Sequence, residues 1–193
     1  MSDRLINRFV LLFVILILPF HASAQHKAYH GDGIDNILEF VPVASAYTLK
    51  ACGVESASSW KRLVVNTAAS YAISMGVAYT LKHAIHKTRP DGTDNRSFPS
   101  GHATRAFAGA TILAHEYGKR SPWIAVAGYG VAALTAADRV RRNRHDATDV
   151  LTGAAIGVAA TELGYFLGDK ITGEKSRYNV SFTGNAMALR ICL

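Results

Sequence analysis

Two cations at the end of a long apolar segment form the first of three clusters that could act on an anion. Lys82 and Arg89 lie seven residues apart, and Pro90 follows Arg89 directly. If the helix persists to Arg89, two turns separate the side chains and both project from one face, although a residue before proline tends to leave the helical conformation. Two cations on one face could bind an anion, but a solvated basic helix end, favoured by the helix dipole, would also account for the pair.

The second cluster is the run Pro99-Ser100-Gly101-His102, which stands before an alanine-rich segment that predicts a helix. Ser100 is a natural N-cap, and Gly101 lets a ligand approach the backbone closely. The free N–H groups of a first helical turn form an anion site, beside which His102 could donate a proton. The alternative is an ordinary helix cap with a surface histidine.

The third cluster is Arg139, His145 and Asp149, in the pattern R-x5-H-x3-D. Asp149 follows His145 by four residues, so its carboxylate can accept a hydrogen bond from one ring nitrogen and fix the tautomer. The other nitrogen is then free to attack or to accept a proton. Three neighbouring arginines are interpreted as a solvated face, which is the usual role of a charge run: Arg141, Arg142 and Arg144.

The spacing of apolar residues predicts the helices that carry these clusters. The predicted helices run from Ile34 to Cys52 with an interruption at Pro42, from near Trp60 to about Lys87, from Gly101 to Gly118, from Pro122 to about Arg142, and from Asp146 to about Lys170. Ser58 or Ser59 can cap the second helix, and Asp146 with Asp149 can cap the last. The predicted fold class is all-α, a bundle of about five to six helices.

The C-terminal residues follow a different pattern. Met187, Leu189, Ile191 and Leu193 alternate along the tail, and residues 183–185 could form a turn, so a short β-hairpin is possible there. Two strands cannot close a membrane barrel, so we interpret them as an appendage. The chain thus divides into residues 1–24, a helical domain over residues 25–175, and a tail over residues 176–193.

Residues 1–24 are predicted to be a signal peptide. Arg4 and Arg8 form a basic region before an unbroken apolar run over residues 9–18, and small residues at 22–24 offer a cleavage site before Gln25. The run is too short to cross a bilayer, which takes about 20 residues, and an uncleaved anchor is the alternative. We therefore expect an exported protein, in the periplasm or in a membrane facing it if the source is a Gram-negative cell.

The charge and composition of the chain indicate which classes of binding partner it favours. The formal net charge is +7 and the isoelectric point is near 9.6, which favours an anionic partner such as a phosphate group or an acidic membrane surface. No nucleic-acid-binding motif is present, and an exported chain rarely meets nucleic acid, so this partner is excluded. Cys52 and Cys192 could pair in an oxidising compartment, and the sequence leaves both their pairing and the oligomeric state open.

Three apolar segments leave the relation to the membrane open. Residues 63–81, 123–137 and 150–167 are rich in Ala, Gly, Ser and Thr, which suits tightly packed helices in water or in a bilayer. The mean hydropathy of +0.12 is low for a chain of several membrane spans. A soluble or peripheral protein and an integral one both fit this pattern.

Taken in order, K-x6-R-P, P-S-G-H and R-x5-H-x3-D resemble the three-part signature of the type 2 phosphatidic acid phosphatase (PAP2) superfamily. The resemblance covers roughly Trp60 to Gly168. One departure is Asp138, where the family often has serine before the arginine of the third motif. An acid there could weaken the positive field around Arg139 or pair with a neighbouring arginine.

The resemblance implies a role for each matched residue. His145 would be the nucleophile that forms a phosphohistidine, Asp149 would orient it, and His102 would protonate the leaving oxygen and then activate water. Five further residues would cradle the phosphoryl oxygens: Lys82, Arg89, Ser100, Gly101 and Arg139.

Such a cradle neutralises a phosphate without a divalent ion, so we expect no metal and no other cofactor. His83 and His86 lie three residues apart and are interpreted as surface residues, not as zinc ligands.

The sequence thus predicts a metal-independent phosphatase acting on a phosphomonoester or diphosphate. A membrane lipid is the favoured substrate: phosphatidic acid, phosphatidylglycerol phosphate, a polyprenyl diphosphate or lipid A. The alternative is a soluble periplasmic acid phosphatase for small phosphomonoesters. A vanadate-dependent haloperoxidase is disfavoured by the short chain, and a catalytically silent lipid-binding bundle by the complete set of catalytic residue types.

Overall fold

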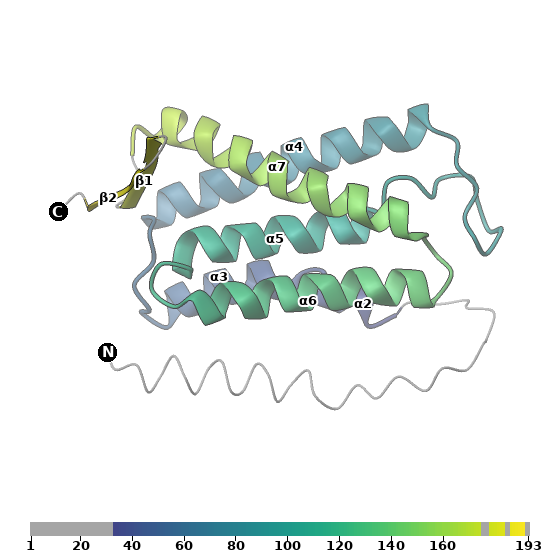
Figure 1. The fold of residues 1–193 in the computed structure, drawn as a ribbon, viewed down its shortest axis with the longest axis horizontal. Helices are drawn as coiled ribbons and strands as arrows, with labels where there is room; N and C mark the ends of the chain where they lie inside the picture. Colours follow the sequence, from purple (N-terminus) through teal and green to yellow (C-terminus); the bar gives the residue numbers. More distant parts are fainter. Residues whose placement is uncertain (1–32, 175–177, 184–185, 192–193) are drawn as a thin grey trace.

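The computed structural model describes residues 33–174, 178–183 and 186–191. Within these residues the chain forms α2 (Asp35–Leu38), α3 (Val41–Ala51), α4 (Trp60–Ala84), α5 (Gly101–Tyr117), α6 (Pro122–Arg141) and α7 (Ala147–Thr172) (Figure 1). The predicted all-α bundle is confirmed. The predicted signal peptide and Cys192 lie outside the described residues. Cys52, the other cysteine of the suggested disulfide, is exposed.

Side-chain caps start the three helices that carry most of the predicted site. The hydroxyl of Ser59 accepts a hydrogen bond from the backbone N of Arg62 at 3.1 Å, and the hydroxyl of Ser100 accepts one from Ala103 N at 3.4 Å. Asp146 and Asp149 form a reciprocal capping box at the start of α7. Each of these caps satisfies N–H groups that the first turn leaves without a helical partner.

The helix α5 lies at the centre of the bundle, with α4 and α7 on one side and α3 and α6 on the other (Figure 1). Small residues let α7 approach both of its neighbours closely. A Cβ on Gly157 would lie 2.5 Å from the carbonyl oxygen of Thr104 on α5, and one on Gly164 would overlap the hydroxyl of Ser70 on α4. The small residues of this segment therefore serve tight helix packing, as the composition indicates.

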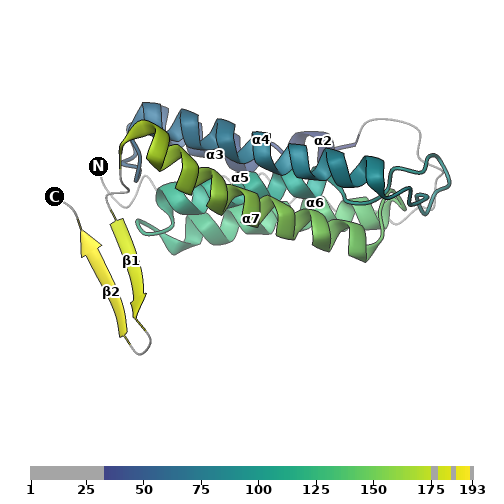
Figure 2. The same ribbon diagram turned by 90° about the horizontal axis from the view of Figure 1, so that it is seen from above.

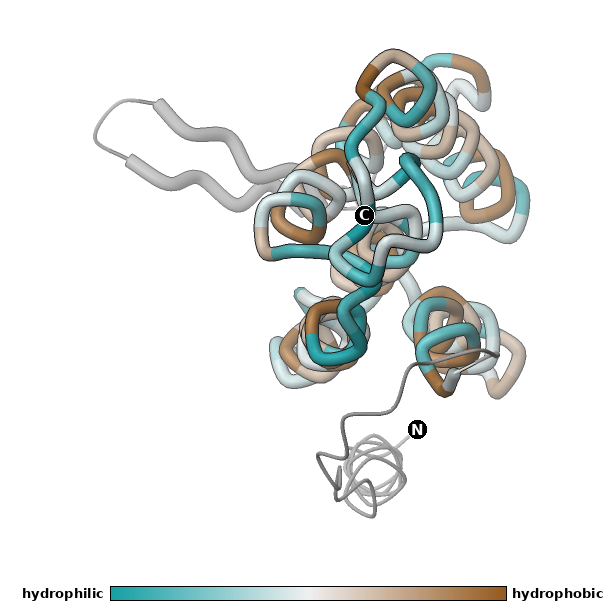
Figure 3. Tube along the Cα trace, turned by 90° about the vertical axis from the view of Figure 1, so that its right-hand side faces the viewer, coloured by the Kyte–Doolittle hydropathy of each residue, from teal (hydrophilic) through white to brown (hydrophobic). Residues whose placement is uncertain are grey.

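The alternating helix directions bring four helix ends together at one end of the bundle. The C-termini of α4 and α6 meet the N-termini of α5 and α7 there. Figure 3 looks onto this end and shows hydrophilic connecting segments in front of helices that carry hydrophobic stretches. All three predicted clusters belong to this end.

Two predicted helix boundaries were wrong. The second long helix ends at Ala84 and does not reach Lys87, since the backbone of Ile85 is already extended, with φ −112° and ψ 100°. Pro42 does not interrupt one helix but lies in the first turn of α3, after the separate short helix α2. Proline is favoured in a first turn because it has no N–H to leave unsatisfied.

The C-terminal tail contains the suggested hairpin strands, β1 (Tyr178–Thr183) and β2 (Ala186–Ile191). They pair antiparallel, with Tyr178 opposite Ile191 and Thr183 opposite Ala186 (Figure 2). Residues 184 and 185 of the predicted turn lie outside the described residues.

One described helix, α7, is long and apolar enough to cross a membrane by length and composition, with a mean hydropathy of 1.5 over its most apolar window. In this structure, 39% of that window is buried. The core helix of a soluble protein meets the same criteria.

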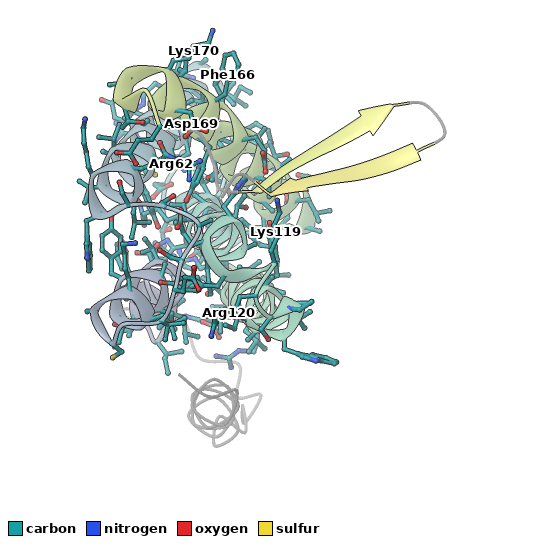
Figure 4. The ribbon with its side chains drawn as sticks, turned by 90° about the vertical axis from the view of Figure 1, so that its left-hand side faces the viewer. Arg62, Lys119, Arg120, Phe166, Asp169 and Lys170 are labelled. Atoms are coloured by element: carbon teal, nitrogen blue, oxygen red, sulfur yellow. The ribbon has the colours of Figure 1, made fainter. Side chains whose placement is uncertain are left out.

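A buried ion pair ties α4 to α7 at the end of the bundle away from the predicted site (Figure 4). The guanidinium of Arg62 donates to both carboxylate oxygens of Asp169, at 2.7 and 3.0 Å. Only 3% of the Arg62 side chain is exposed. The same guanidinium contacts Ser58, whose hydroxyl donates to Glu116 at 2.6 Å.

Replacing Arg62 with leucine is expected to lower the free energy of unfolding by about 3 to 5 kcal/mol, because it leaves a partly buried carboxylate without its cation. Chemical denaturation of the variant measures this loss. The double variant R62L/D169L should recover part of it, since no carboxylate is then left unpaired. A loss of less than about 1 kcal/mol, typical of surface pairs, would contradict the buried-pair interpretation.

Candidate active site

The structure brings the predicted residues together from four helices and two loops. Lys82 lies in the last turn of α4, His102 in the first turn of α5, and Arg139 in the last turn of α6. Asp149 lies in the first turn of α7, and Ser100 caps α5. Arg89 and His145 lie in the loops that precede α5 and α7.

The His145 ring sits between an acid and a cation. Its Nδ1 lies 3.4 Å from Oδ2 of Asp149, and its Nε2 lies 3.1 Å from a terminal nitrogen of Arg89. A guanidinium only donates hydrogen bonds, so Nε2 presents its lone pair and the ring proton belongs on Nδ1, facing Asp149. This is the tautomer that the i to i+4 spacing of the two residues predicts.

Burial keeps the His145 ring neutral. Only 2% of the side chain is exposed. Burial and repulsion from the nearby cations together lower the pKa of His145 to about 3, and Asp149 only partly opposes this effect. These cations are Arg89, Arg139 and Lys82. The imidazole is therefore unprotonated at neutral pH and holds a lone pair for attack.

Arg89 reaches the site from a loop, not from the face of a helix as the seven-residue spacing suggested. Its Nε donates to Asp94 at 2.8 Å, and its backbone N donates to the carbonyl of Asp94 at 2.9 Å. One terminal nitrogen also donates to the carbonyl of Arg144 at 3.1 Å. Since α4 has already ended, these loop contacts place the guanidinium beside His145.

Lys82 holds the loop that leads into α5. Its ammonium donates to the backbone carbonyls of Arg96 at 2.7 Å and Pro99 at 2.8 Å. Burial, together with repulsion from Arg89, lowers the pKa of Lys82 to about 8. Lys82 therefore remains largely protonated at neutral pH but loses its proton under mildly alkaline conditions.

Lys82→Arg is expected to change the alkaline side of the pH profile. In the parent protein kcat/KM should fall as the pH rises through about 8, because the free protein then loses the Lys82 charge. A guanidinium stays protonated in this range, so the decline should disappear in the variant. Measurement of kcat/KM across this range tests this, with the exposed Lys61→Arg as control. An unchanged decline in Lys82→Arg would contradict the assignment.

His102 lies against the N-terminal part of the described chain. Its Nε2 is 2.7 Å from Oδ1 of Asn36. An amide oxygen only accepts, so Nε2 carries a proton and the neutral ring offers its lone pair at Nδ1. Burial lowers the pKa of His102 to about 3, with Arg139 as the strongest of the repelling cations.

Arg139 pairs with an acid that the motifs do not include. One terminal nitrogen donates to Asp35, and only 7% of the Arg139 side chain is exposed. Its Nε is buried and has no hydrogen-bond partner among the described residues. A buried guanidinium with an unused donor can hydrogen-bond an anionic ligand.

The predicted solvated face was wrong for part of the arginine run. Arg142 is paired with Asp35 and only 8% of its side chain is exposed. Arg144 donates to Asp91 at 2.8 Å, and only Arg141 is well exposed. The cause for Arg142 is the fully buried carboxylate of Asp35, which needs cationic partners.

Sequence reasoning missed four polar residues around the site. Asp35 and Asn36 on α2 contact Arg139 and His102, as described above. Ser97 donates to Asp149, and Lys87 donates to the other oxygen of the same carboxylate at 2.8 Å. Asp35 and Asn36 lie outside the three motifs, so no spacing in the sequence pointed to them.

Asp138, the departure from the family pattern, pairs with its neighbours. It accepts hydrogen bonds from Arg141 at 2.7 and 3.0 Å. Of the two alternatives that the sequence left open, the structure shows the pairing.

His83 is exposed and its Nδ1 lies 2.8 Å from the carbonyl of Tyr79, and His86 is exposed as well. Among residues 33–174 and the two strands, no three His, Cys, Asp or Glu side chains are grouped to hold a metal ion.

A model of the PAP2 superfamily matches residues 63–170. The matched stretch is more than half of the chain and includes all the predicted site residues. The protein belongs to the PAP2 superfamily.

A lipid A 1-phosphatase of Porphyromonas gingivalis is 42% identical to this chain over 151 residues, which are 78% of this chain and 34% of the relative. The chain thus spans about a third of the length of that curated relative.

Two solved structures are similar to this chain. The crystal structure of Aquifex aeolicus LpxE has a TM-score of 0.48 and 21% identity, with 85% of this chain and 87% of that chain covered. A transmembrane PAP2-type phosphatidylglycerolphosphate phosphatase from Bacillus subtilis has a TM-score of 0.45 and 21% identity, with 83% and 94% covered.

Proposed function

We propose that this protein is a metal-independent phosphatase that removes a phosphate group from a membrane lipid through a phosphohistidine on His145. The observation that carries the proposal is the His145 ring: it is buried and neutral, its Nδ1 faces Asp149, and its Nε2 lone pair points to the cations of the site. A neutral imidazole with one nitrogen fixed by a carboxylate is an activated nucleophile.

In the first step, Nε2 of His145 attacks phosphorus, and the bond from phosphorus to the lipid oxygen breaks. His102, protonated at Nδ1 while the phosphate is bound, gives that proton to the leaving oxygen and keeps the Nε2 proton that it donates to Asn36. In the free protein, nearby arginines disfavour protonation of His102. A bound phosphate anion offsets their positive charge and therefore raises the pKa of the ring.

In the second step, His102 takes a proton from water, and the resulting hydroxide attacks the phosphohistidine. The bond between phosphorus and Nε2 breaks, and inorganic phosphate leaves. Asp149 stabilises the positive charge that the His145 ring carries while the phosphoryl group is attached.

The phosphoryl oxygens are held by the predicted cradle. Lys82 and Arg89 supply positive charge at the helix end and loop, Arg139 offers its unused Nε–H, and Ser100 and Gly101 offer a hydroxyl and a backbone N–H. These donors neutralise charge on the equatorial oxygens, where phosphoryl transfer needs it most.

The relative in Porphyromonas gingivalis and the surface of the bundle support a lipid as the substrate. That relative is a lipid A 1-phosphatase, so the phosphate of lipid A is our first candidate. The outer face of α7 exposes large apolar side chains, which suits contact with acyl chains: Leu151, Leu163, Phe166 and Ile171. The net charge of +7 suits an anionic membrane surface, and the predicted signal peptide suits a site that faces the periplasm.

A substrate panel on the purified protein tests the proposal. Lipid A, phosphatidic acid, phosphatidylglycerol phosphate, a polyprenyl diphosphate and p-nitrophenyl phosphate are compared for release of inorganic phosphate. Preferential hydrolysis of a lipid supports the proposal. Faster hydrolysis of p-nitrophenyl phosphate by a detergent-free fraction would favour the soluble acid phosphatase instead.

EDTA is expected to leave the activity unchanged, because protein cations supply the charge that divalent ions supply in metal-dependent phosphatases. The assay compares phosphate release with and without the chelator, beside a metal-dependent phosphatase as a positive control for chelation. Loss of activity that is restored by added metal would contradict this mechanism.

A further inference from the structure

The carboxylate of Asp149 is held from both sides by residues outside the three motifs. Its Oδ1 accepts from the ammonium of Lys87 at 2.8 Å, and its Oδ2 accepts from the hydroxyl of Ser97. The backbone N of Asp146 also donates to Oδ2, at 3.2 Å. Asp149 is fully buried, so these donors replace the water that an exposed carboxylate would have.

Lys87 and Ser97 are themselves joined. The backbone N of Ser97 donates to the carbonyl of Lys87 at 2.9 Å. The two ends of the loop between α4 and α5 are therefore tied together, and both side chains reach the same carboxylate. Ser97 is fully buried, and its Oγ also lies 3.4 Å from Nδ1 of His145.

The Lys87 ammonium is charged at neutral pH. Although burial lowers the pKa of Lys87, its hydrogen bonds to Asp146 and Asp149 outweigh this effect and raise the pKa above its ordinary value. Asp149 thus has a permanent cation on the oxygen that does not face His145.

We propose that Lys87 and Ser97 are positioning residues for the nucleophile, acting through Asp149. Lys87 on Oδ1 and Ser97 on Oδ2 keep the carboxylate ionised and prevent its rotation, so that Oδ2 stays aimed at Nδ1 of His145. The inference rests on the proposed phosphohistidine mechanism and adds to it the two residues that keep the His145 ring in its attacking orientation.

A purely structural role for Lys87 makes a different prediction. Lys87 also contacts Asp146, the N-cap of α7, and donates to the exposed Thr148 hydroxyl at 2.9 Å. If Lys87 only fastened the start of α7, its loss would lower stability but would not depend on the presence of the Asp149 carboxylate.

A double-mutant cycle separates these two roles. Lys87→Met, Lys87→Arg and Thr148→Val are made in the full chain, and Lys87→Met is also combined with Asp149→Asn. The lipid that is hydrolysed best in the substrate panel is the probe, and kcat and KM are measured together with the melting temperature of each variant.

We expect Lys87→Met to lower kcat about 10- to 100-fold with little change in KM, since a small misplacement of a catalytic group has an effect of this size. Lys87→Arg should recover most of the rate because it keeps the charge, and Thr148→Val should match the parent. In the Asp149→Asn background, Lys87→Met should cause no further loss, because residues that act as a unit are not additive.

Equal losses from Lys87→Met with and without the Asp149 carboxylate would overturn the inference, and so would a Thr148→Val variant as slow as Lys87→Met. If Lys87→Met does not fold, Ser97→Ala replaces it in the same cycle with the same expected pattern. The proposed function is tested separately: it fails if a His145→Gln variant remains as active as the parent.

Discussion

His145→Gln should lower kcat for lipid phosphate hydrolysis by at least about 10³-fold, since removing a nucleophile from a catalytic unit has effects of this size or larger. Glutamine resembles the imidazole in size and polarity but offers no ring nitrogen lone pair to phosphorus. The ring in this protein is buried, neutral and held by Asp149, so little of the site remains to replace it.

The intermediate itself gives the more direct measurement. Rapid acid-free quenching of the parent with labelled substrate should trap phosphoryl groups on the protein, in a linkage that is labile to acid and stable to alkali, as expected for a phosphorus–nitrogen bond. The exposed His83→Gln is the matched control and should leave both the rate and the intermediate unchanged. If the His145→Gln variant also becomes labelled, another residue is the nucleophile.

Local spacing made the contact between His145 and Asp149 predictable. Asp149 follows His145 by four residues, and the cap at Asp146 starts a helix between them, so their contact requires only local structure. The same holds for Ser100, which caps α5 and places Gly101 and His102 in the first turn. Caps and short spacings are encoded in neighbouring residues, and the sequence is informative about them.

Contacts across the fold were not predictable in this way. Arg89 reaches His145 only because the chain leaves α4 at Ala84 and the loop folds back through Asp94. The sequence suggested that Arg142 belongs to a solvated run, yet it forms an ion pair with Asp35, more than 100 residues earlier. A periodicity within one helix contains no information about such a partner, because the contact depends on how α2 packs against α6.

The second large effect is expected at His102, and it should depend on the leaving group. His102→Ala should lower the rate on a lipid phosphate about 10²- to 10⁴-fold, the usual contribution of a general acid. With p-nitrophenyl phosphate the first step should lose much less, because nitrophenolate leaves readily without a proton. The second step still lacks the base that activates water, so the phosphohistidine should accumulate.

Pre-steady-state kinetics can detect this change of rate-limiting step. With p-nitrophenyl phosphate, His102→Ala should release a burst of about one nitrophenolate per molecule, followed by slow turnover, which is the signature of an accumulating covalent intermediate. The parent on the same substrate is the control for burst size. Equal losses on the lipid and on the nitrophenyl ester, with no burst, would contradict the role of His102 in both proton transfers. His102→Ala removes the proposed proton carrier, whose Nε2 contacts Asn36, and keeps the residues of the proposed phosphate cradle, Lys82, Arg89 and Arg139.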